Sequence, residues 1–472
     1  MLLAFAWGYG YHRDELYFLA AGHHLDWAYA DQGPVTPLIA RAMSEIAPNS
    51  LTVLRLPSAL AAGLTVLLTG LLAREFGGGR RASSIAAACA AVAGLVLFTG
   101  HLLSTSTFDL LAWTLVLWLC VRAIRTGSDR LWLVAGVVLG IGLLNKPLPA
   151  FLAAGMFAGV VIAGPRRLLR NPYVWLGAAI AVLLWLPWIL WQADHGWPQI
   201  DVSRSIAAGN SKSSEPWWAI VPFQFLLVSP LLAPVWVAGL VRLFRDPGLR
   251  DFRFLGWTWV VLAVVFMASG GKPYYLGGLL PALLGAGAVP VDVWLERGRQ
   301  TVRRALLGVA IAASAAVSLV VCLPVLPAKD ADFAVAMNGD VGETIGWPEL
   351  VQTVAGVAQG LPGTPDRVVV FTRNYGEAGA IDRYGPALGL SGAYSGHNAY
   401  WEWGPPPDGA RPLITVGFDP ALADRWFRGC ALAARVENDA DIDNDESGAP
   451  VLACTGPRES WSREWPALRR LG

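Results

Sequence analysis

Two adjacent carboxylates near the start of the chain are the first residues that could do chemistry. Asp14 and Glu15 follow a short apolar segment, so we expect them to lie near a membrane surface. A charge inside a bilayer is costly unless it is paired or lines a wet cavity. The two acids are therefore either an interfacial pair that ends a helix or a functional pair that can accept a proton.

His23, His24 and Asp26 follow on the next turns of an expected surface helix. They are either solvated side chains or ligands of a metal ion, and their spacing does not decide between the two. The cysteines offer no metal site of their own, because the sequence contains no CxxC pair.

Asp109 is a second acid in an unusual place. It lies about one turn inside a long apolar segment, after Ser104 to Thr107, which already supply side chains that can cap a helix. Because an acid inside an apolar span is expensive, we interpret Asp109 as a functional residue.

Two lysines occupy very short turns between apolar segments. Lys146 lies in LLNKPLP and Lys272 in SGGKPYYLGG, and they are two of only four lysines in the chain. They are either anchors that reach to the membrane interface or ligands of a phosphate group. Tyr274 and Tyr275 add hydroxyl donors beside Lys272, which favours the phosphate. Arg204 and Lys212, in a longer loop, are further candidates for the same role.

These residues are embedded in a chain whose composition is typical of a membrane protein. Of its 472 residues, 54% are hydrophobic and only 15% are charged, against about 25% charged in soluble domains. The 22 tryptophans fit that interpretation, because their rings favour the headgroup boundary. The net charge of +1 gives no reason to expect a nucleic acid partner.

A membrane helix needs about 20 mostly apolar residues. Candidate spans are 52–73, 83–99, 107–124, 131–145, 148–164, 173–192, 217–241, 254–270, 274–294 and 305–326. The apolar segment 1–11 is about half a span, and we expect it to be the remainder of a first helix from a truncated or misassigned start. The sequence therefore predicts a polytopic α-helical membrane protein with about 11 spans.

The arginines predict how the chain is oriented. Loops on one side of the membrane are rich in arginine, with three or four in each of 74–81, 122–130, 166–170, 242–253 and 297–304. Loops on the other side have few. Since cytoplasmic loops carry the excess of Lys and Arg, the arginine-rich side is cytoplasmic. Residues 12–51, both lysine turns and the tail from about 328 are then extracytoplasmic.

The tail, residues 328–472, is predicted to be a small extracytoplasmic α/β domain after a membrane domain at 1–327. Residues 367–372 and 413–418 are typical of buried strands, and residues 348–359 of an amphipathic helix. Cys430 and Cys454 could form a disulfide in an oxidising exterior, or remain two thiols. A group of polar and aromatic side chains within the tail either stacks on a sugar or packs the small domain against the membrane part. Its members are His397, Asn398, Tyr400, Trp401 and Trp403.

The order of these motifs along the chain, and their common location on one side of the membrane, resemble those of a family, the glycosyltransferases of the C-type fold. The similarity is to bacterial relatives of dolichyl-phosphate-mannose protein mannosyltransferases and of the aminoarabinose transferases of lipid A. The matching pieces are Asp14-Glu15 followed by Tyr17, the segment QGPVTPLIA, Asp109, the Lys-Pro turn at Lys146, and the KxYY stretch from Lys272. The tail segments NYGEAGAIDRYGP and SGHNAYWEWGPP are similar to a bacterial subgroup.

The resemblance implies an inverting transfer of a sugar from a polyprenyl-phosphate donor to a glycan, lipid or protein acceptor at the outer face of the cytoplasmic membrane. Asp14 would be the base, with Glu15 as its partner or as a group that orients the acceptor. Lys146, Lys272, Tyr274, Tyr275 and Arg204 would hold the phosphate. Asp109 would bind sugar hydroxyls or a metal.

Whether the reaction needs a divalent metal stays open, with His23, His24 and Glu15 as candidate ligands. One alternative function is a transporter or flippase of a lipid-linked saccharide. Transporters often carry inverted repeats, and the sequence contains none that stands out. The other alternative is a membrane scaffold, which would leave the acids and lysines above without a role.

Overall fold

The computed structural model describes residues 1–211, 214–409 and 411–472. The chain divides into two compact units. Unit 1 comprises Met1–Leu3, Gln32–Thr36 and Arg55–Leu323, and unit 2 comprises Ala4–Asp31, Pro37–Leu54 and Pro324–Gly472. The first outer segment was expected to belong to the membrane domain. In the structure most of it belongs instead with the tail.

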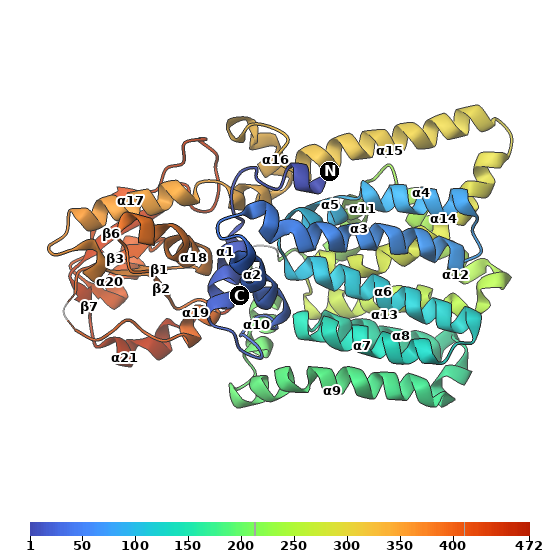
Figure 1. The fold of residues 1–472 in the computed structure, drawn as a ribbon, viewed down its shortest axis with the longest axis horizontal. Coiled ribbons are helices and arrows are strands. Elements are labelled where there is room, and N and C mark those ends of the chain that lie inside the picture. The colour runs from blue at the N-terminus through green and yellow to red at the C-terminus, as the bar shows by residue number, and fades with distance from the viewer. Residues whose placement is uncertain (212–213, 410) are drawn as a thin grey trace. The chain divides into compact units, whose positions relative to one another are not determined.

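Unit 1 is helical (Figure 1). Its helices are α3 (Leu51–Glu75, which starts in unit 2), α4 (Arg80–Ala91), α5 (Gly94–His101), α6 (Thr105–Thr126), α7 (Arg130–Asn145), α8 (Leu148–Ala163), α9 (Pro172–Asp194), α10 (Pro198–Ala207), α11 (Ile220–Val228), α12 (Ala233–Arg245), α13 (Arg253–Ser269), α14 (Leu280–Glu296) and α15 (Gln300–Cys322). A 3-10 helix, η5 (Pro273–Leu279), leads into α14.

Six helical segments of the described residues are long and apolar enough to cross a membrane, or eight if each of two bent pairs counts as one span. Two of them, α9 and α15, leave most of their apolar side chains exposed, including Leu183, Leu190 and Val309. An exposed apolar helix surface of this kind is stable in lipid rather than in water. The chain is therefore a multi-pass helical membrane protein.

The expected span 217–241 consists of two helices, α11 and α12, rather than one. The chain bends by 118° between α11 and α12. Ser229, which precedes Pro230, has a φ of +117°, and a residue before proline is disfavoured in the helical region. The Ser229 hydroxyl is 2.7 Å from the Ser314 hydroxyl of α15, which gives the break a polar partner.

Small residues let the helices of unit 1 approach closely. A Cβ atom at Gly239 of α12 would lie 1.9 Å from the Leu283 carbonyl oxygen of α14, and a Cβ at Gly136 of α7 would lie 2.2 Å from the Gly177 carbonyl of α9. Packing through small residues replaces the hydrophobic driving force that lipid does not provide. It fixes α7, whose C-terminal end carries the Lys146 turn.

Unit 2 combines helices with a mixed sheet. The helices are α1 (Arg13–His23), most of α2 (Val35–Ile46), α16 (Asp332–Met337), α17 (Trp347–Gln359), α18 (Tyr375–Tyr384), α19 (Ala399–Glu402), α20 (Pro420–Trp426) and α21 (Trp461–Glu464). The strands are β1 (Val369–Thr372), β2 (Tyr394–Ser395), β3 (Leu413–Val416), β4 (Phe427–Arg428), β5 (Ala431–Arg435), β6 (Pro450–Cys454) and β7 (Gly456–Pro457).

The five-stranded sheet of unit 2 has the order β2-β1-β3-β6-β5. β1 pairs in parallel with β2 and β3, while β6 is antiparallel to β3 and β5. The two expected strands and the helix at 348–359 are confirmed as β1, β3 and α17. All four residues of β1 and of β3 are buried, as expected for strands that are covered on both faces.

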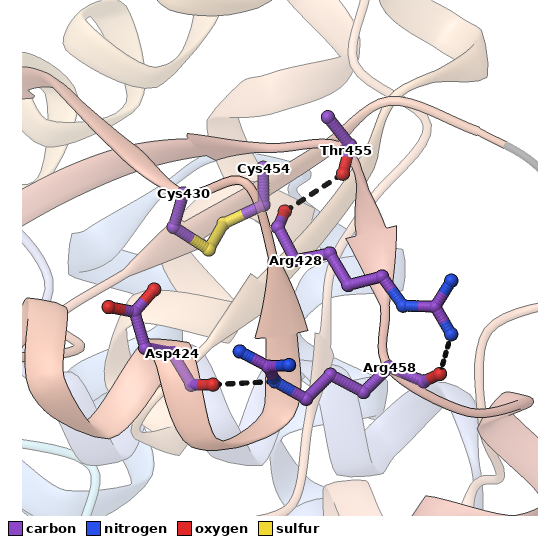
Figure 2. Close-up of a disulfide and its surroundings, with 6 residues drawn as sticks. All are labelled: Asp424, Arg428, Cys430, Cys454, Thr455 and Arg458. Carbon is purple, nitrogen blue, oxygen red and sulfur yellow. Dashed lines mark hydrogen bonds between the residues drawn. A yellow bond between two sulfur atoms is a disulfide. The ribbon is translucent and has the colours of Figure 1, made fainter.

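Unit 2 also contains a disulfide between Cys430, just before β5, and Cys454, at the end of β6 (Figure 2). Of the two states that the sequence left open, a disulfide or two thiols, the structure has the disulfide. Next to it, the Thr455 hydroxyl donates to the Arg428 carbonyl at 2.9 Å, and the Arg458 side chain donates to the Asp424 carbonyl at 2.6 Å. The remaining cysteines, Cys89, Cys120 and Cys322, are buried thiols on helices of unit 1.

Candidate functional site

Asp14 and Glu15 lie in the first turn of α1. His12 caps this helix, because its Nδ1 accepts the Asp14 backbone N–H at 3.2 Å while its own N–H donates to Glu15 Oε2 at 2.8 Å. The pair therefore begins a helix rather than ending one, and both acids are favoured by the positive end of the helix dipole. Glu15 is fully buried in this capping box, whereas Asp14 stays partly exposed.

The Asp14 carboxylate is held by a residue far away in the sequence. The Tyr375 hydroxyl, at the start of α18, donates to Asp14 Oδ1 at 2.8 Å. The Tyr375 ring stacks on Tyr17 with centroids 4.6 Å apart, and the Arg13 guanidinium lies 4.8 Å from the centroid of the Tyr375 ring. Burial, above all, holds the pKa of Tyr375 well above its usual value, so the hydroxyl keeps its proton and remains a donor.

Sequence features of α18 explain why Tyr375 is placed there. Asn374 caps the helix, and Glu377 Oε2 accepts hydrogen bonds from the Arg373 and Asn374 backbone N–H groups at 2.9 and 3.0 Å. A Cβ atom at Gly379 would lie 2.9 Å from the Leu16 backbone, so glycine lets α18 pack directly on α1. The tail motif NYGEAGA thus holds the DE motif in place.

A second carboxyl, Asp31, belongs to the same group of side chains. Its oxygens accept from the Tyr17 hydroxyl at 2.8 Å and from the Asn398 amide at 2.9 Å. Burial raises the pKa of Asp31 to about 6, and the Tyr17 hydrogen bond opposes that rise. We call Asp14, Tyr17, Asp31, Tyr375 and Asn398 the Asp14 cluster.

The lysine turn of unit 1 builds a separate group of polar side chains. Lys146, at the end of α7, donates from Nζ to the Ser106 hydroxyl at 3.3 Å. The same Nζ lies 5.3 Å from the Tyr274 ring centroid and 5.5 Å from that of Tyr275. The ammonium is thus held by a hydroxyl and two aromatic faces.

Asp109 of α6 completes this group. It is buried, it interacts electrostatically with Lys146, and its Oδ1 accepts the Trp113 indole N–H at 3.1 Å. We call Ser106, Asp109, Lys146, Tyr274 and Tyr275 the Lys146 cluster. The structure thus brings together four residues that the sequence singled out, from α6, the α7–α8 turn and η5.

The segment QGPVT also contacts this turn. The Thr36 hydroxyl donates to Asn145 Oδ1 at 2.7 Å, and the Asn145 amide donates to the Thr105 carbonyl at 2.8 Å. A Cβ atom at Gly33 would lie 1.8 Å from the Leu144 carbonyl oxygen, so only glycine permits this approach. Asn145 therefore fixes the backbone on which Lys146 stands.

The other candidate residues lie in different surroundings. Lys272 is half-buried at the start of η5, next to the tyrosines of the Lys146 cluster. Arg204 is exposed on α10, where it pairs with Asp201 at 3.1 Å. Lys212 falls outside the described residues.

The two candidate histidines, His23 and His24, are both exposed. His23 contacts Arg41 at 3.1 Å, and the His24 ring stacks on Trp403 with centroids 4.4 Å apart. Glu15 is committed to the helix cap instead of facing them. The described residues contain no group of three or more His, Cys, Asp or Glu side chains arranged to hold a metal ion.

Among the tail residues between 397 and 403, some are buried in unit 2 and others are partly exposed. His397 and Asn398 are buried in contact with α18 and Asp31, and Trp401 exchanges indole hydrogen bonds with Trp465 in the core of unit 2. Trp403 is partly exposed.

The sequence analysis did not single out Tyr375 or Asp31 as functional residues. Tyr375 lies inside the motif NYGEAGAIDRYGP, and Asp31 directly precedes the segment QGPVTPLIA. The signal available in the sequence was a polar residue inside or beside a motif that matches the family.

Comparisons with known proteins show which proteins the chain is similar to. Residues 31–191 match the family model described as dolichyl-phosphate-mannose-protein mannosyltransferase. A curated relative, an undecaprenyl phosphate-alpha-4-amino-4-deoxy-L-arabinose arabinosyl transferase of Pseudomonas fluorescens, is 29% identical over 52% of this chain and 45% of its own length. The chain thus spans about half the length of the curated relatives that it matches.

Solved structures extend the similarity to nearly the whole chain. ArnT from Cupriavidus metallidurans superimposes with a TM-score of 0.61 in the apo state, at 15% identity, over 96% of this chain and 95% of that one. The fold is that of the C-type glycosyltransferases. The same protein bound to undecaprenyl phosphate gives a TM-score of 0.60 over 96% of both chains, also at 15% identity. The resemblance to this C-type family that the sequence motifs indicated is confirmed.

Proposed function

We propose that the chain is a glycosyltransferase that moves a sugar from a polyprenyl-phosphate donor to an acceptor hydroxyl. The observation that carries the proposal is the Lys146 cluster: a cation, two tyrosines and an acid at the turns of apolar helices. One solved structure of similar fold is a complex with undecaprenyl phosphate, which supports a donor of this class. Curated relatives named as arabinosyl transferases support the reaction type.

In this proposal the Lys146 cluster binds the donor. Lys146 and Lys272 neutralise the phosphate, and the Tyr274 and Tyr275 hydroxyls donate hydrogen bonds to its oxygens. Asp109 holds the Lys146 ammonium and accepts from sugar hydroxyls. Arg204 is a poorer candidate, because its guanidinium is exposed and already paired with Asp201.

Asp14 is the proposed base. It removes the proton of the acceptor hydroxyl as that oxygen forms its bond to the anomeric carbon. The bond between this carbon and the phosphate oxygen breaks, the phosphate leaves with the electron pair, and attack from the opposite face inverts the configuration. Tyr375 positions Asp14, while Glu15 acts through the helix cap.

We further propose that unit 2 is extracytoplasmic. Its segments 4–31 and 324–472 pack as one unit and must share a side of the membrane, which requires an even number of crossings between them. Six spans meet this requirement, and so do the eight obtained when each bent pair crosses the membrane once. If the two shorter helices, α7 and α8, also cross the membrane, the number is ten, which is again even. The disulfide supports the outer side, because disulfides persist in oxidising compartments.

The test gives the purified full chain, in lipid nanodiscs, a radiolabelled undecaprenyl-phosphate sugar and a membrane extract as the source of acceptor. We expect label to move from the donor to an acceptor in a time-dependent reaction. A parallel sample in sealed vesicles measures whether the labelled lipid crosses the bilayer. Lipid crossing without consumption of the donor would overturn the transferase and favour a flippase.

A further inference from the structure

Unit 2 contains a cleft that has no part in the chemistry proposed above. It has a volume of about 370 Å³, and its lining includes residues from α1 and from the loops around β1, β2 and β3. A volume of this order accommodates one or two monosaccharide units. We infer that this cleft is a saccharide-binding site whose wall is the Trp403–His24 ring pair and whose floor is the Asp382 carboxyl.

The aromatic wall is the first observation. The Trp403 ring is partly exposed and lies 4.4 Å from the His24 ring, at an interplanar angle of only 15°. Tyr400 supports it from behind with centroids 4.5 Å apart. His24 is the exposed member of this stacked pair. An aromatic ring that is exposed in a polar cleft presents a flat surface on which the C–H face of a pyranose ring packs.

The second observation is a carboxyl that is already fixed in place. Asp382 accepts the Tyr400 hydroxyl at 2.6 Å and the Ala393 backbone N–H at 2.9 Å, one on each oxygen. A carboxylate has about four acceptor sites, so two remain for sugar hydroxyls. The loop is shaped around this group, because a Cβ atom at Gly392 would lie 3.0 Å from Asp382 Oδ1.

The remaining polar groups indicate the kind of saccharide. Asp366 and Arg411 are exposed at the cleft, so its carboxylates outnumber its one guanidinium. Burial lowers the pKa of His24, and its neutral ring can both donate to and accept from hydroxyls at pH 7. This balance favours a neutral or amino sugar over a phosphorylated one.

The cleft is also adjacent to the Asp14 cluster within the same unit. Tyr17 lies 6.3 Å from Tyr400 and 6.4 Å from Trp403, measured between ring centroids, and it also stacks on Tyr375. One aromatic layer thus separates the cleft from the residues that hold Asp14. On the basis of the proposed transferase function, the saccharide in the cleft is part of the acceptor.

Binding is measured first and without any transfer reaction. The full chain in nanodiscs is titrated with mannotriose, with the glucosamine trimer and with mannose 6-phosphate, and contacts are detected by saturation-transfer difference NMR. We expect at least one of the two trimers to bind and the phosphate to bind at least tenfold more weakly. We expect Trp403→Ala and Asp382→Asn each to weaken trimer binding at least tenfold.

Two matched controls test whether the effect is local. Trp27→Ala removes another exposed indole of unit 2, and Asp424→Asn another exposed carboxylate, and neither residue lines the cleft. Both should bind the trimer as the wild type does. Failure of both trimers to bind the wild type, or binding of a serine-rich peptide in their place, would overturn the saccharide site.

The acceptor role is tested separately with the labelled donor and graded amounts of membrane extract. Trp403→Ala should lower transfer at least tenfold when extract is limiting and approach the wild-type rate when extract is saturating. If the trimer binds but the wild type transfers no label, the transferase function fails and the saccharide site stands. If transfer by Trp403→Ala equals that of the wild type at every extract level, the cleft is not an acceptor site.

Discussion

The Lys146 cluster of unit 1 and the Asp14 cluster of unit 2 solve the same physical problem in different ways. Each must hold charged groups where water is scarce. In unit 1 the lysine and its acid are placed by the ends of packed helices, and their contacts include a hydroxyl, an indole and two tyrosine rings. In unit 2 the carboxyls are held by hydrogen bonds from residues more than 360 positions away.

The difference indicates a division of labour. The Lys146 cluster offers a cation with aromatic walls, which suits a phosphate anion at the end of a lipid. The Asp14 cluster offers a partly exposed carboxylate that accepts from the Tyr375 hydroxyl, which suits proton transfer. A substitution in one cluster should therefore damage one step and spare the other.

The largest expected effect belongs to Asp14. Asp14→Asn keeps the shape of the side chain and removes the base, so we expect the transfer rate to fall roughly 10²–10⁴-fold. Binding of undecaprenyl phosphate should not change. Single-turnover transfer of labelled sugar measures the rate, and Asp26→Asn, an exposed acid after α1, is the control that should keep the wild-type rate.

Lys146 should show the reverse pattern. Lys146→Ala removes a charge-assisted bond to the phosphate, typically worth about 1.5–3 kcal/mol, so affinity for undecaprenyl phosphate should fall roughly 10–150-fold. Equilibrium binding of the radiolabelled lipid in nanodiscs measures this loss. Lys329→Ala, a lysine of unit 2, should bind as the wild type does; equal losses in both variants would point to a nonspecific charge effect.

Tyr375→Phe sharpens the account of Asp14. The variant keeps the ring that stacks on Tyr17 and loses only the hydroxyl that donates to Asp14 Oδ1. We expect the maximal transfer rate to fall about tenfold with no change in the donor concentration for half-maximal rate, because one hydrogen bond to a carboxylate typically contributes about 1.5–3 kcal/mol. Tyr384→Phe, on the same helix, is the matched control and should have no such effect.

The disulfide is expected to affect stability alone. Replacing both Cys430 and Cys454 by serine should lower the free energy of unfolding of unit 2 by about 3 kcal/mol, as expected for closing a loop of this length. Pulse proteolysis of the full chain, with and without reductant, measures the change. Reductant should weaken the wild type and leave the double variant as it was.

The smallest effect is a pH dependence at Asp31. Its pKa is raised to about 6, chiefly by burial, so between pH 4 and 6 the native state keeps a proton that the unfolded chain releases. The free energy of unfolding contributed by this group therefore falls as the pH rises through that range. Denaturation at pH 4.5 and 6.5 should show a smaller difference for Asp31→Asn than for the wild type; an unchanged difference would contradict this assignment.

The sequence predicted the residues of the Lys146 cluster better than those of the Asp14 cluster. Asp109, Lys146 and Tyr275 stand out because a charged or polar residue is rare in an apolar helix. Tyr375 does not stand out in a polar tail, and its bond to Asp14 depends on how α18 packs on α1. For the same reason, the sequence did not predict that residues 4–31 belong with the tail, since apolar runs give spans but not tertiary contacts.

The bent segment at α11 and α12 illustrates the same limit. Its 25 residues are mostly apolar and satisfy the length rule for a span, and the break depends on two residues, Ser229 and Pro230. The arginine pattern, in contrast, is insensitive to such local detail. It predicts that the first outer segment and the tail share a side of the membrane, and the packing of most of that segment with the tail in unit 2 agrees with this prediction.

The most direct test of the account measures both steps on the same preparations. Wild type, Asp14→Asn, Lys146→Ala and the double variant are compared for equilibrium binding of radiolabelled undecaprenyl phosphate and for single-turnover sugar transfer. We expect Asp14→Asn to bind the lipid normally without transferring sugar, and Lys146→Ala to recover part of its transfer at high donor concentration. Loss of lipid binding in Asp14→Asn, or full transfer by that variant, would contradict the division of labour between the two clusters.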